Sequence, residues 1–137
     1  MGMEIDKITE TIIGCAFTVS NTLGVGFLEK VYENALMREF ALQGLNAQSQ
    51  VPLCGSYKGQ VVGRYVVDLL VENRILVELK AQEQLPASSE AQLINYLRAS
   101  GKKIGLLINR PCHLLIKNGA NGFLRFIAIR HIFPGIA

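Results

Sequence analysis

The sequence has few of the residues from which disulfide scaffolds and soft-metal sites are built. Its 137 residues include three cysteines, two histidines and no tryptophan. An odd number of cysteines without a Cys-x-x-Cys pair argues against a disulfide framework or a cysteine-built zinc site and favours a reducing, cytoplasmic environment. No apolar run approaches the ~18 residues that a membrane span needs, and acids precede the first basic residue, so we expect neither a membrane span nor a signal peptide.

The composition is that of a folded chain, since 50% of the residues are hydrophobic and 18% are charged. No repeat or linker interrupts it, so we expect a single domain over residues 1–137. Residues 101–137 carry six basic residues and no acid. Such a segment either binds phosphates or is a solvated basic face, and the sequence leaves both interpretations open.

Apolar spacing predicts three helices. Residues 5–23 repeat apolar side chains every three or four positions, which predicts a first helix. A second helix is expected over residues 27–43, with Gly44 as its stop, and a third from an N-cap at Ser88 to Gly101. The inward face of the second helix is expected to contain Leu28, Val31, Ala35, Leu36 and Phe40.

Between the second and third helices the pattern changes to runs rich in Val, Leu and Tyr. Strands are expected at residues 51–57, 61–71 and 74–79, joined by hairpin turns. The apolar run at 104–109 predicts a buried strand, parallel to its neighbour because a helix connects the two. Two shorter strands are expected at 113–117 and 123–129. This order predicts an α/β fold, with helices packed on a mixed sheet.

Two acids and a lysine interrupt strands that are otherwise apolar: Asp68, Glu78 and Lys80. A buried carboxylate is costly unless it is paired, hydrogen-bonded or bound to a metal. Two converging carboxylates make an oxygen site for a hard cation such as Mg²⁺, and a nearby ammonium orients a water and offsets phosphate charge. The alternative is a cross-strand ion pair on a half-exposed sheet, and the spacing alone does not decide.

The metal hypothesis depends on the register of the hairpin around residues 72–74. Opposed residues of an antiparallel pair point to the same side of the sheet. A two-residue turn would place Asp68 opposite Val77 and send Glu78 to the other face. A three-residue turn with Asn73 left-handed, or a bulge, places Asp68 opposite Glu78. We therefore predict that the two acids and Lys80 share one face.

Polar residues from other elements surround these strands. Glu29, Tyr32 and Glu33 follow helical spacing, so one face of the second helix carries two acids and a phenol. We expect Glu29 to approach the two strand acids, and Arg64 to extend their face. Gln92 follows the lysine strand on the third helix, where its amide would bind a phosphate or a metal-bound water. Simple solvation is the alternative for these helix residues.

Several motifs, in order, resemble the bacterial GxxExxY protein family, which is similar to the PD-(D/E)XK (restriction-endonuclease-like) nucleases. They are Gly26-Phe27-Leu28-Glu29-Lys30-Val31-Tyr32, Tyr57-Lys58-Gly59, Asp68, Ile75-Leu76-Val77-Glu78-Leu79-Lys80-Ala81, Ala91-Gln92-Leu93-Ile94-Asn95-Tyr96-Leu97 and Gly105-Leu106-Leu107-Ile108-Asn109. The chain departs from the family at Ser89-Glu90, where relatives often carry a histidine, and at Arg110-Pro111, where they usually carry phenylalanine. These departures concern substrate preference rather than the Asp, Glu and Lys set.

The resemblance implies a restriction-endonuclease-like fold and metal-dependent hydrolysis of phosphodiester bonds. It implies Asp68, Glu78 and the main-chain carbonyl of Leu79 as ligands of Mg²⁺ or Mn²⁺, and Lys80 as the lysine that orients the attacking water. Glu29 is implied as an additional acid and a further metal ligand. Gln92 would complete the catalytic set.

Nucleic acid is the expected partner, with DNA favoured over RNA. The basic residues expected to contact phosphates are Arg64, Lys102, Lys103 and Arg110. A homodimer is also expected, because nucleases that cut both strands commonly pair two active sites. The alternative to an enzyme is a nucleic-acid- or protein-binding regulatory module that retains the nuclease fold without catalysis. A third interpretation, hydrolysis of a small phosphorylated metabolite, requires a closed pocket that the sequence does not show.

Overall fold

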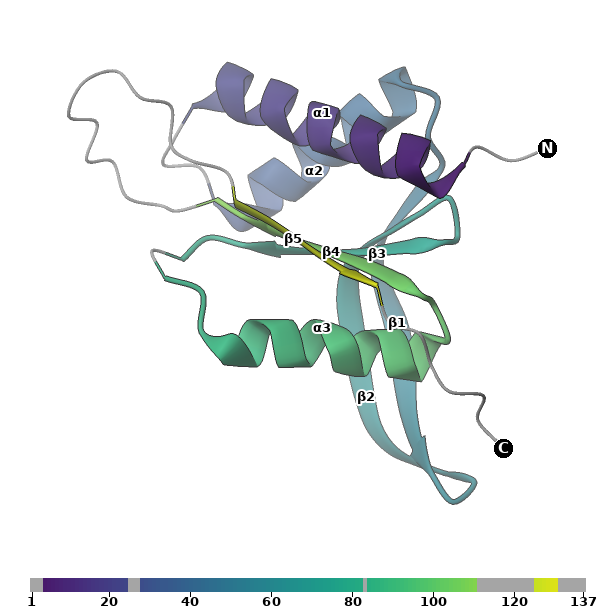
Figure 1. The fold of residues 1–137 in the computed structure, drawn as a ribbon. Helices are drawn as coiled ribbons and strands as arrows, with labels where there is room; N and C mark the ends of the chain where they lie inside the picture. Colours follow the sequence, from purple (N-terminus) through teal and green to yellow (C-terminus); the bar gives the residue numbers. More distant parts are fainter. Residues whose placement is uncertain (1–3, 25–27, 83, 111–124, 131–137) are drawn as a thin grey trace.

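The computed structural model describes residues 4–24, 28–82, 84–110 and 125–130 (Figure 1). The predicted strand at 113–117 lies outside these residues. In chain order the elements are α1 (Ile5–Leu23), α2 (Glu29–Leu42), β1 (Ala47–Tyr57), β2 (Gln60–Val71), β3 (Ile75–Lys80), α3 (Ala87–Ser100), β4 (Ile104–Asn109) and β5 (Arg125–Arg130). No helix in the described part of the chain is long and apolar enough to cross a membrane.

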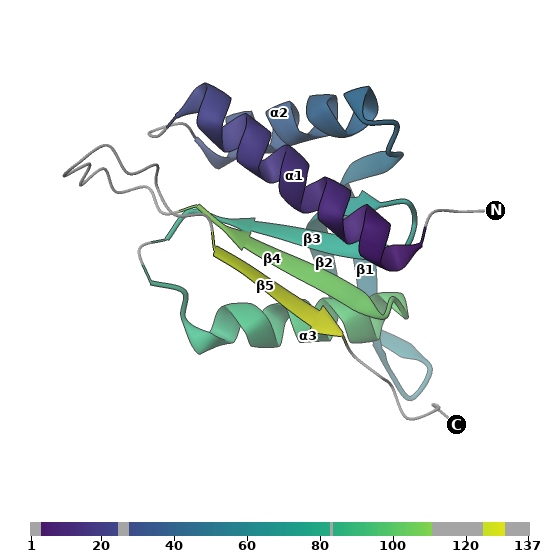
Figure 2. The ribbon, with the colours of Figure 1, turned by 45° about the horizontal axis from the view of Figure 1, so that its top comes forward.

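The strands form one mixed sheet in the order β1-β2-β3-β4-β5. β3 and β4 pair in parallel, as predicted from the helix that connects them, and the other neighbouring strands pair antiparallel. Helices α1 and α2 cover one face of the sheet and α3 covers the other (Figures 1 and 2). The predicted α/β class is therefore confirmed.

Both faces of the sheet are buried by apolar packing, which explains why the central strands read as unbroken apolar runs. The cluster beneath α1 and α2 includes Ile8, Ile12, Leu36, Phe40, Leu69, Val77 and Leu106. The cluster beneath α3 includes Val67, Leu70, Leu76, Leu93, Leu97 and Leu107. Helix α3 approaches β4 so closely that a Cβ on Gly105 would lie 2.9 Å from Cγ of Leu93.

The inward face of α2 differs from the prediction. Leu28 and Val31 were expected inside but are 76% and 39% exposed, whereas Tyr32 and Glu33 are each 3% exposed. The Tyr32 hydroxyl donates to the carbonyl of Ala16 at 3.0 Å, so α1 satisfies the phenol that apolar periodicity placed outside. Because buried polar groups need such partners, the partner decides which face of the helix turns inward.

Several other element boundaries differ from the prediction by one or two residues, and that of β1 differs by four. Helix α3 begins at Ala87 with Pro86 as N-cap, so Ser88 lies inside the first turn and does not cap it. The fixed φ of proline suits a helix entrance and its missing N–H costs nothing there. Strand β1 begins at Ala47, four residues earlier than predicted, because Ala47 pairs with Val71 on β2. Residues 47–50 are mostly polar and do not predict a strand by themselves, but pairing with β2 extends β1 over them.

Candidate functional site

The register between β2 and β3 is the predicted one. Val71 pairs with Ile75, and the pairing continues through Leu70 and Leu76 to Leu69 and Val77. Residues 72–74 form a three-residue turn in which Asn73 has a φ of 54°, as predicted, and Glu72 has a φ of 53°. Backbone pairing thus stops one step before Asp68 and Glu78 would face each other.

At that step the two acids bind each other's strands through their side chains. The backbone N–H of Asp68 donates to Glu78 Oε1 at 2.8 Å. In the opposite direction, the backbone N–H of Leu79 donates to Asp68 Oδ2 at 2.8 Å. Each carboxylate therefore takes the place of a main-chain acceptor, and both carboxylates are drawn into the gap between the two strands.

The donor set in this gap fits a hard divalent cation. One oxygen of each acid is held by a backbone N–H, which leaves Asp68 Oδ1, 3.4 Å from Gln50 Nε2, and Glu78 Oε2, 3.9 Å from Lys80 Nζ. Mg²⁺ is commonly held by one or two carboxylates, with water and substrate phosphate in the remaining positions. Within the described residues, no group of three or more His, Cys, Asp or Glu side chains is arranged to hold a metal ion. The fit thus depends on this pair of acids.

The two acids share an electrostatic strain that a cation would relieve. Burial, and then the charge of Asp68, raise the pKa of Glu78 to about 7, while the Asp68 N–H and the Lys80 ammonium oppose the rise. Burial also raises the pKa of Asp68, against the hydrogen bond from Leu79 and with the charge of Glu33 adding to the rise. Like charges held together out of water favour the neutral form.

Lys80 is positioned by residues from three elements. Its ammonium lies 3.9 Å from Glu78 Oε2 and donates to Gln92 Oε1 on α3 at 3.1 Å. Its main-chain carbonyl accepts the N–H of Arg110 at the end of β4, at 2.7 Å. Gln92 was predicted to bind a phosphate or a metal-bound water, and the structure places its amide oxygen on the lysine.

Glu29 approaches the acids from the first turn of α2, as predicted. Its pKa is raised by partial desolvation and by the negative charge of Asp68, while the positive charge of Lys80 opposes the rise. These interactions place Glu29 within electrostatic reach of both strand residues. The side chain is exposed, so it faces the open side of the site.

Two further members of the network are Glu33, which the sequence analysis named only as part of the acidic face of the second helix, and Gln50, which it did not name. Glu33 is buried, pairs with Lys30 and accepts a hydrogen bond from Gln50 Nε2 at 2.6 Å. The same amide nitrogen lies 3.4 Å from Asp68 Oδ1. Gln50 has a φ of 53° in the middle of β1, a left-handed conformation that costs a non-glycine residue about 1–3 kcal/mol. The helical spacing of Glu33 relative to Glu29 was a weak signal that it belongs to the site. No sequence pattern indicates that Gln50 belongs to it.

The four basic residues expected to contact phosphate lie in different places. Arg64 is exposed on β2, four residues before Asp68. The ammonium of Lys102 donates to Asn73 Oδ1 at 3.2 Å, which places it and the adjoining Lys103 at the end of β3 away from Lys80.

Arg110 is 8% exposed, and its guanidinium carbon lies 5.2 Å from the ring centroid of Tyr32. Its Nη2 atom has no hydrogen-bond partner in the described part of the chain. Stacking on an aromatic face accounts for the burial of this arginine. Of the four basic residues, Arg64 alone is exposed on a strand that carries a site acid.

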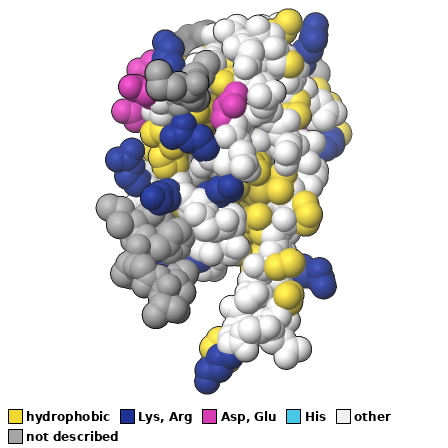
Figure 3. All heavy atoms as spheres, turned by 90° about the vertical axis from the view of Figure 1, so that its right-hand side faces the viewer, with side chains coloured by type: hydrophobic (Ala, Val, Ile, Leu, Met, Phe, Trp, Pro, Cys, Tyr) yellow, Lys and Arg dark blue, Asp and Glu magenta, His cyan; other side chains and the backbone are white. Residues whose placement is uncertain are grey.

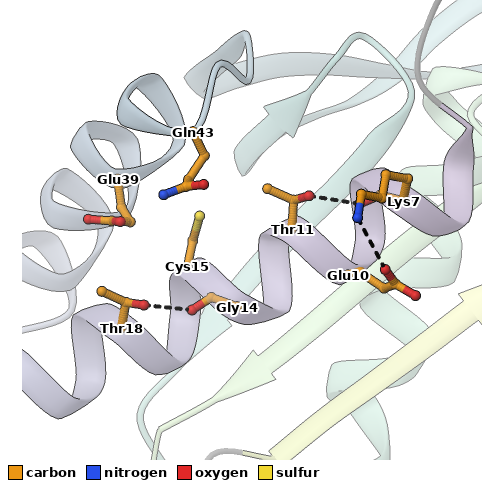
Figure 4. Close-up of a pocket in the computed structure, with 8 residues that line it drawn as sticks. All are labelled: Lys7, Glu10, Thr11, Gly14, Cys15, Thr18, Glu39 and Gln43. Carbon is orange, nitrogen blue, oxygen red and sulfur yellow. Dashed lines mark hydrogen bonds and ion pairs between the residues drawn. The ribbon is translucent and has the colours of Figure 1, made fainter.

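A separate cavity of about 360 Å³ lies between α1 and α2 (Figure 4). Its lining residues are Lys7, Glu10, Thr11, Gly14, Cys15, Thr18, Glu39 and Gln43. Burial, followed by the charge of Glu39, raises the pKa of Cys15 to about 11, so this thiol stays protonated and unreactive at neutral pH. The cavity shares no residue with the carboxylate site.

The chain belongs to the PD-(D/E)XK nuclease superfamily, whose sequence profile matches residues 6–120. The solved structure titled "Crystal structure of SSO0001" shares its fold, with 17% identity and a TM-score of 0.52 over 93% of this chain. The match covers 59% of that protein, so the chain spans about three fifths of its length. An alkaline exonuclease from Laribacter hongkongensis is 12% identical, with a TM-score of 0.49 over 94% of this chain and 72% of its own. No curated protein matches the chain.

Proposed function

We propose that this chain, as a member of the GxxExxY branch of the superfamily, hydrolyses phosphodiester bonds of nucleic acid with a divalent cation. The observation that carries the proposal is the crosswise hydrogen bonding of Asp68 and Glu78, which holds two carboxylates together beside Lys80. A superfamily of nucleases supports the same chemistry. A half-exposed ion pair would not need a second acid, Asp68, whose charge raises the pKa of buried Glu78.

In this proposal Asp68 Oδ1, Glu78 Oε2 and the main-chain carbonyl of Leu79 hold Mg²⁺ or Mn²⁺. Such an ion, when bound, polarises a phosphoryl oxygen and lowers the pKa of a bound water. The two carboxylates would have to be ionised to hold the cation, so Glu78, whose pKa is raised to about 7, would release its proton to solvent. The hydrogen bonds from the two backbone N–H groups keep each carboxylate in one orientation.

The Lys80 ammonium orients the attacking water and offsets the negative charge that develops on the phosphate. Gln92 acts on the lysine, because its amide oxygen accepts a hydrogen bond from the ammonium and fixes the direction of the side chain. Glu29 adds a carboxylate from the open side, where its raised pKa suits it to exchange a proton with water or to join the cation. We propose DNA as the preferred substrate, and a homodimer as the form that cuts both strands.

A cleavage assay with matched metal conditions tests this proposal. Supercoiled plasmid, single-stranded DNA, branched DNA and RNA are each incubated with the protein in Mg²⁺, in Mn²⁺ and in EDTA. We expect cleavage in a metal and none in EDTA, with Asp68→Asn inactive and the distant variant Lys7→Ala as active as the original chain. If the original chain is inert on every substrate in both metals, the proposed enzymatic function is wrong. The alternative, a non-catalytic binding module, then takes its place.

A further inference from the structure

Strands β1 and β2 continue beyond the rest of the sheet as a two-stranded ribbon that extends past α3 (Figure 1). We call residues 54–64 of this ribbon the arm. All arm residues are exposed except Gly55 and Gly63, which are half-buried. The tip is a tight turn in which Lys58 and Gly59 have φ values of 47° and 79°. The arm is therefore a solvent-facing ribbon that begins close to the carboxylate site.

One face of the arm is covered by its own chain. Gly55 and Gly63 face each other across the two strands, and a Cβ on either would lie 3.0 Å from the side chain of Tyr65. The Tyr65 ring in turn packs against Tyr96 of α3, with ring centroids 5.5 Å apart. This stack fixes the base of the arm against α3, and a fixed surface loses little entropy when it binds a partner.

The opposite face of the arm and its base is bare and partly apolar. Successive strand residues alternate between faces, so Arg64 and Val66 point away from Tyr65 and from α3. Val66 is 50% exposed, and Val62 on the same strand is 65% exposed. Pro52 lies opposite Val66 on β1, and Cys54 opposite Arg64. Side chains of this size, exposed together, mark an interaction surface.

The charge of the arm selects an anionic partner. The sequence holds no Asp or Glu between Glu39 and Asp68, and Lys58 and Arg64 are the charged residues of the arm. In Figure 3 the projection at the bottom of the molecule carries hydrophobic and basic side chains and no acidic one. A basic ribbon that leads to a site for phosphate chemistry matches a phosphate backbone.

The shape of the arm favours duplex DNA. The major groove of B-form DNA admits a two-stranded β-ribbon, whereas that of A-form RNA is too narrow for side chains to enter. Lys58 precedes Asp68 by ten residues. At about 3.3 Å per strand residue the tip lies about 33 Å along the chain from the acid, or about ten base pairs of duplex.

Pairing with a second copy of this chain fits the arm less well. Among the described strands β1 lies at an edge of the sheet, and an open edge invites another strand to add to it. However, Pro52 has no N–H to offer, Gln50 breaks the extended backbone with a φ of 53°, and the register shifts between Gly55 and Ser56. Such features block edge-to-edge addition.

We propose that the arm docks on duplex DNA beside the scissile bond, with Lys58 and Arg64 on phosphates and the exposed side chains of the bare face against the groove. This inference rests on the proposed function and adds the form of the substrate and the surface that binds it. It also accounts for an exposed apolar ribbon next to a polar site.

Equilibrium binding in EDTA tests the arm without cleavage. A labelled duplex of roughly 30 base pairs, about three times the reach of the arm, is titrated at several salt concentrations and followed by fluorescence anisotropy. The double variant Lys58→Ala/Arg64→Ala is compared with Lys7→Ala/Arg38→Ala, which removes the same net charge from exposed positions on α1 and α2. We expect the arm variant to bind at least about tenfold more weakly and to lose about 1.8 from the slope of log K against log salt. The control should match the original chain.

Three results would overturn the proposal. The arm variant could bind duplex DNA as the original chain does, or double-stranded RNA could bind as tightly as DNA. Sedimentation could also show a dimer that Val62→Ser converts to a monomer, which would make the arm a contact between copies. Because the binding is measured in EDTA, a chain that binds through the arm but never cleaves refutes the proposed function and leaves the arm proposal standing. If the original chain cleaves nucleic acid and the arm variant binds duplex DNA normally, the arm proposal is refuted and the proposed function stands.

Discussion

Strands β2 and β3 are joined in two different ways along their length. Near the turn, Leu69, Leu70 and Val71 pair with β3 through the main chain, and all three side chains are buried. One step further from the turn, the N–H groups of Asp68 and Leu79 donate to carboxylates instead of carbonyls. The same pair of strands is thus a regular ladder at one end and a polar gap at the other.

The two ends of this strand pair contribute in different ways, one through apolar burial and the other through its carboxylates. Where the main chain satisfies itself, side chains are free to be apolar and contribute burial. Where carboxylates replace carbonyls, the regular main-chain pairing of β2 and β3 ends, and each acid keeps one oxygen that these backbone N–H groups do not hold. The cost is visible as the raised pKa values of Glu78 and Asp68, two acids held out of water.

The largest expected effect lies at the polar gap. Lys80→Ala should reduce the cleavage rate by about 10²–10⁴, because it removes the group that we propose orients the water, while leaving Mn²⁺ affinity close to that of the original chain. Asp68→Asn should weaken Mn²⁺ binding itself. Calorimetry with Mn²⁺ and initial cleavage rates separate the two. Equal loss of metal affinity in both variants would show that Lys80 supports the fold of the gap rather than the reaction.

The next effect tests the paired end. Leu76 is fully buried beneath α3, so Leu76→Ala should lower the free energy of unfolding by about 2–5 kcal/mol. Val66→Ala, at a half-exposed position on β2, should change it by less than about 0.5 kcal/mol. Urea denaturation followed by circular dichroism measures both. A small loss for Leu76→Ala would mean that the paired end does not carry the stability assigned to it.

The cost of the gap itself should depend on pH. The pKa of Glu78 is raised in the folded chain from its ordinary 4.5 to about 7, so folding favours the protonated acid. Its contribution is therefore most favourable below about pH 4.5 and declines as the pH rises through 7. In EDTA, as the pH rises from about 4.5 to above 7, the free energy of unfolding of the original chain should fall by up to about 3 kcal/mol relative to that of Glu78→Gln.

Urea denaturation of both chains at several pH values gives this difference, and the comparison cancels the titration of the other acids. Added Mn²⁺ should reduce the decline, because a bound cation stabilises the ionised pair. If the free energy of unfolding depends on pH in the same way for the original chain and for Glu78→Gln, the pKa of Glu78 is not raised in the folded chain.

The parts of this site that could be predicted from sequence are those with a local signature. Asp68, Glu78 and Lys80 stand out because they interrupt apolar strands, and the length of the turn fixes their register. Glu33 was named as part of an acidic helix face, but its burial was not predicted, because that depends on how α2 packs against the sheet. Apolar periodicity placed Leu28 inside on the same helix, and the structure exposes it. Packing between elements far apart in the sequence determines whether these side chains are buried. Apolar periodicity along one helix carries no information about that packing.

Gln50 gives the smallest effect and the finest test of the gap. Its left-handed backbone costs about 1 kcal/mol or more, while its amide contacts Glu33 and Asp68. Gln50→Ala keeps the strain and loses the amide, so it should lower stability by about 1 kcal/mol and weaken Mn²⁺ binding severalfold. Gln50→Gly relieves the strain, so its stability should return toward that of the original chain while Mn²⁺ binding stays weak. If glycine restores both, the amide does not position Asp68, and Gln50 is a feature of the bend in β1 alone.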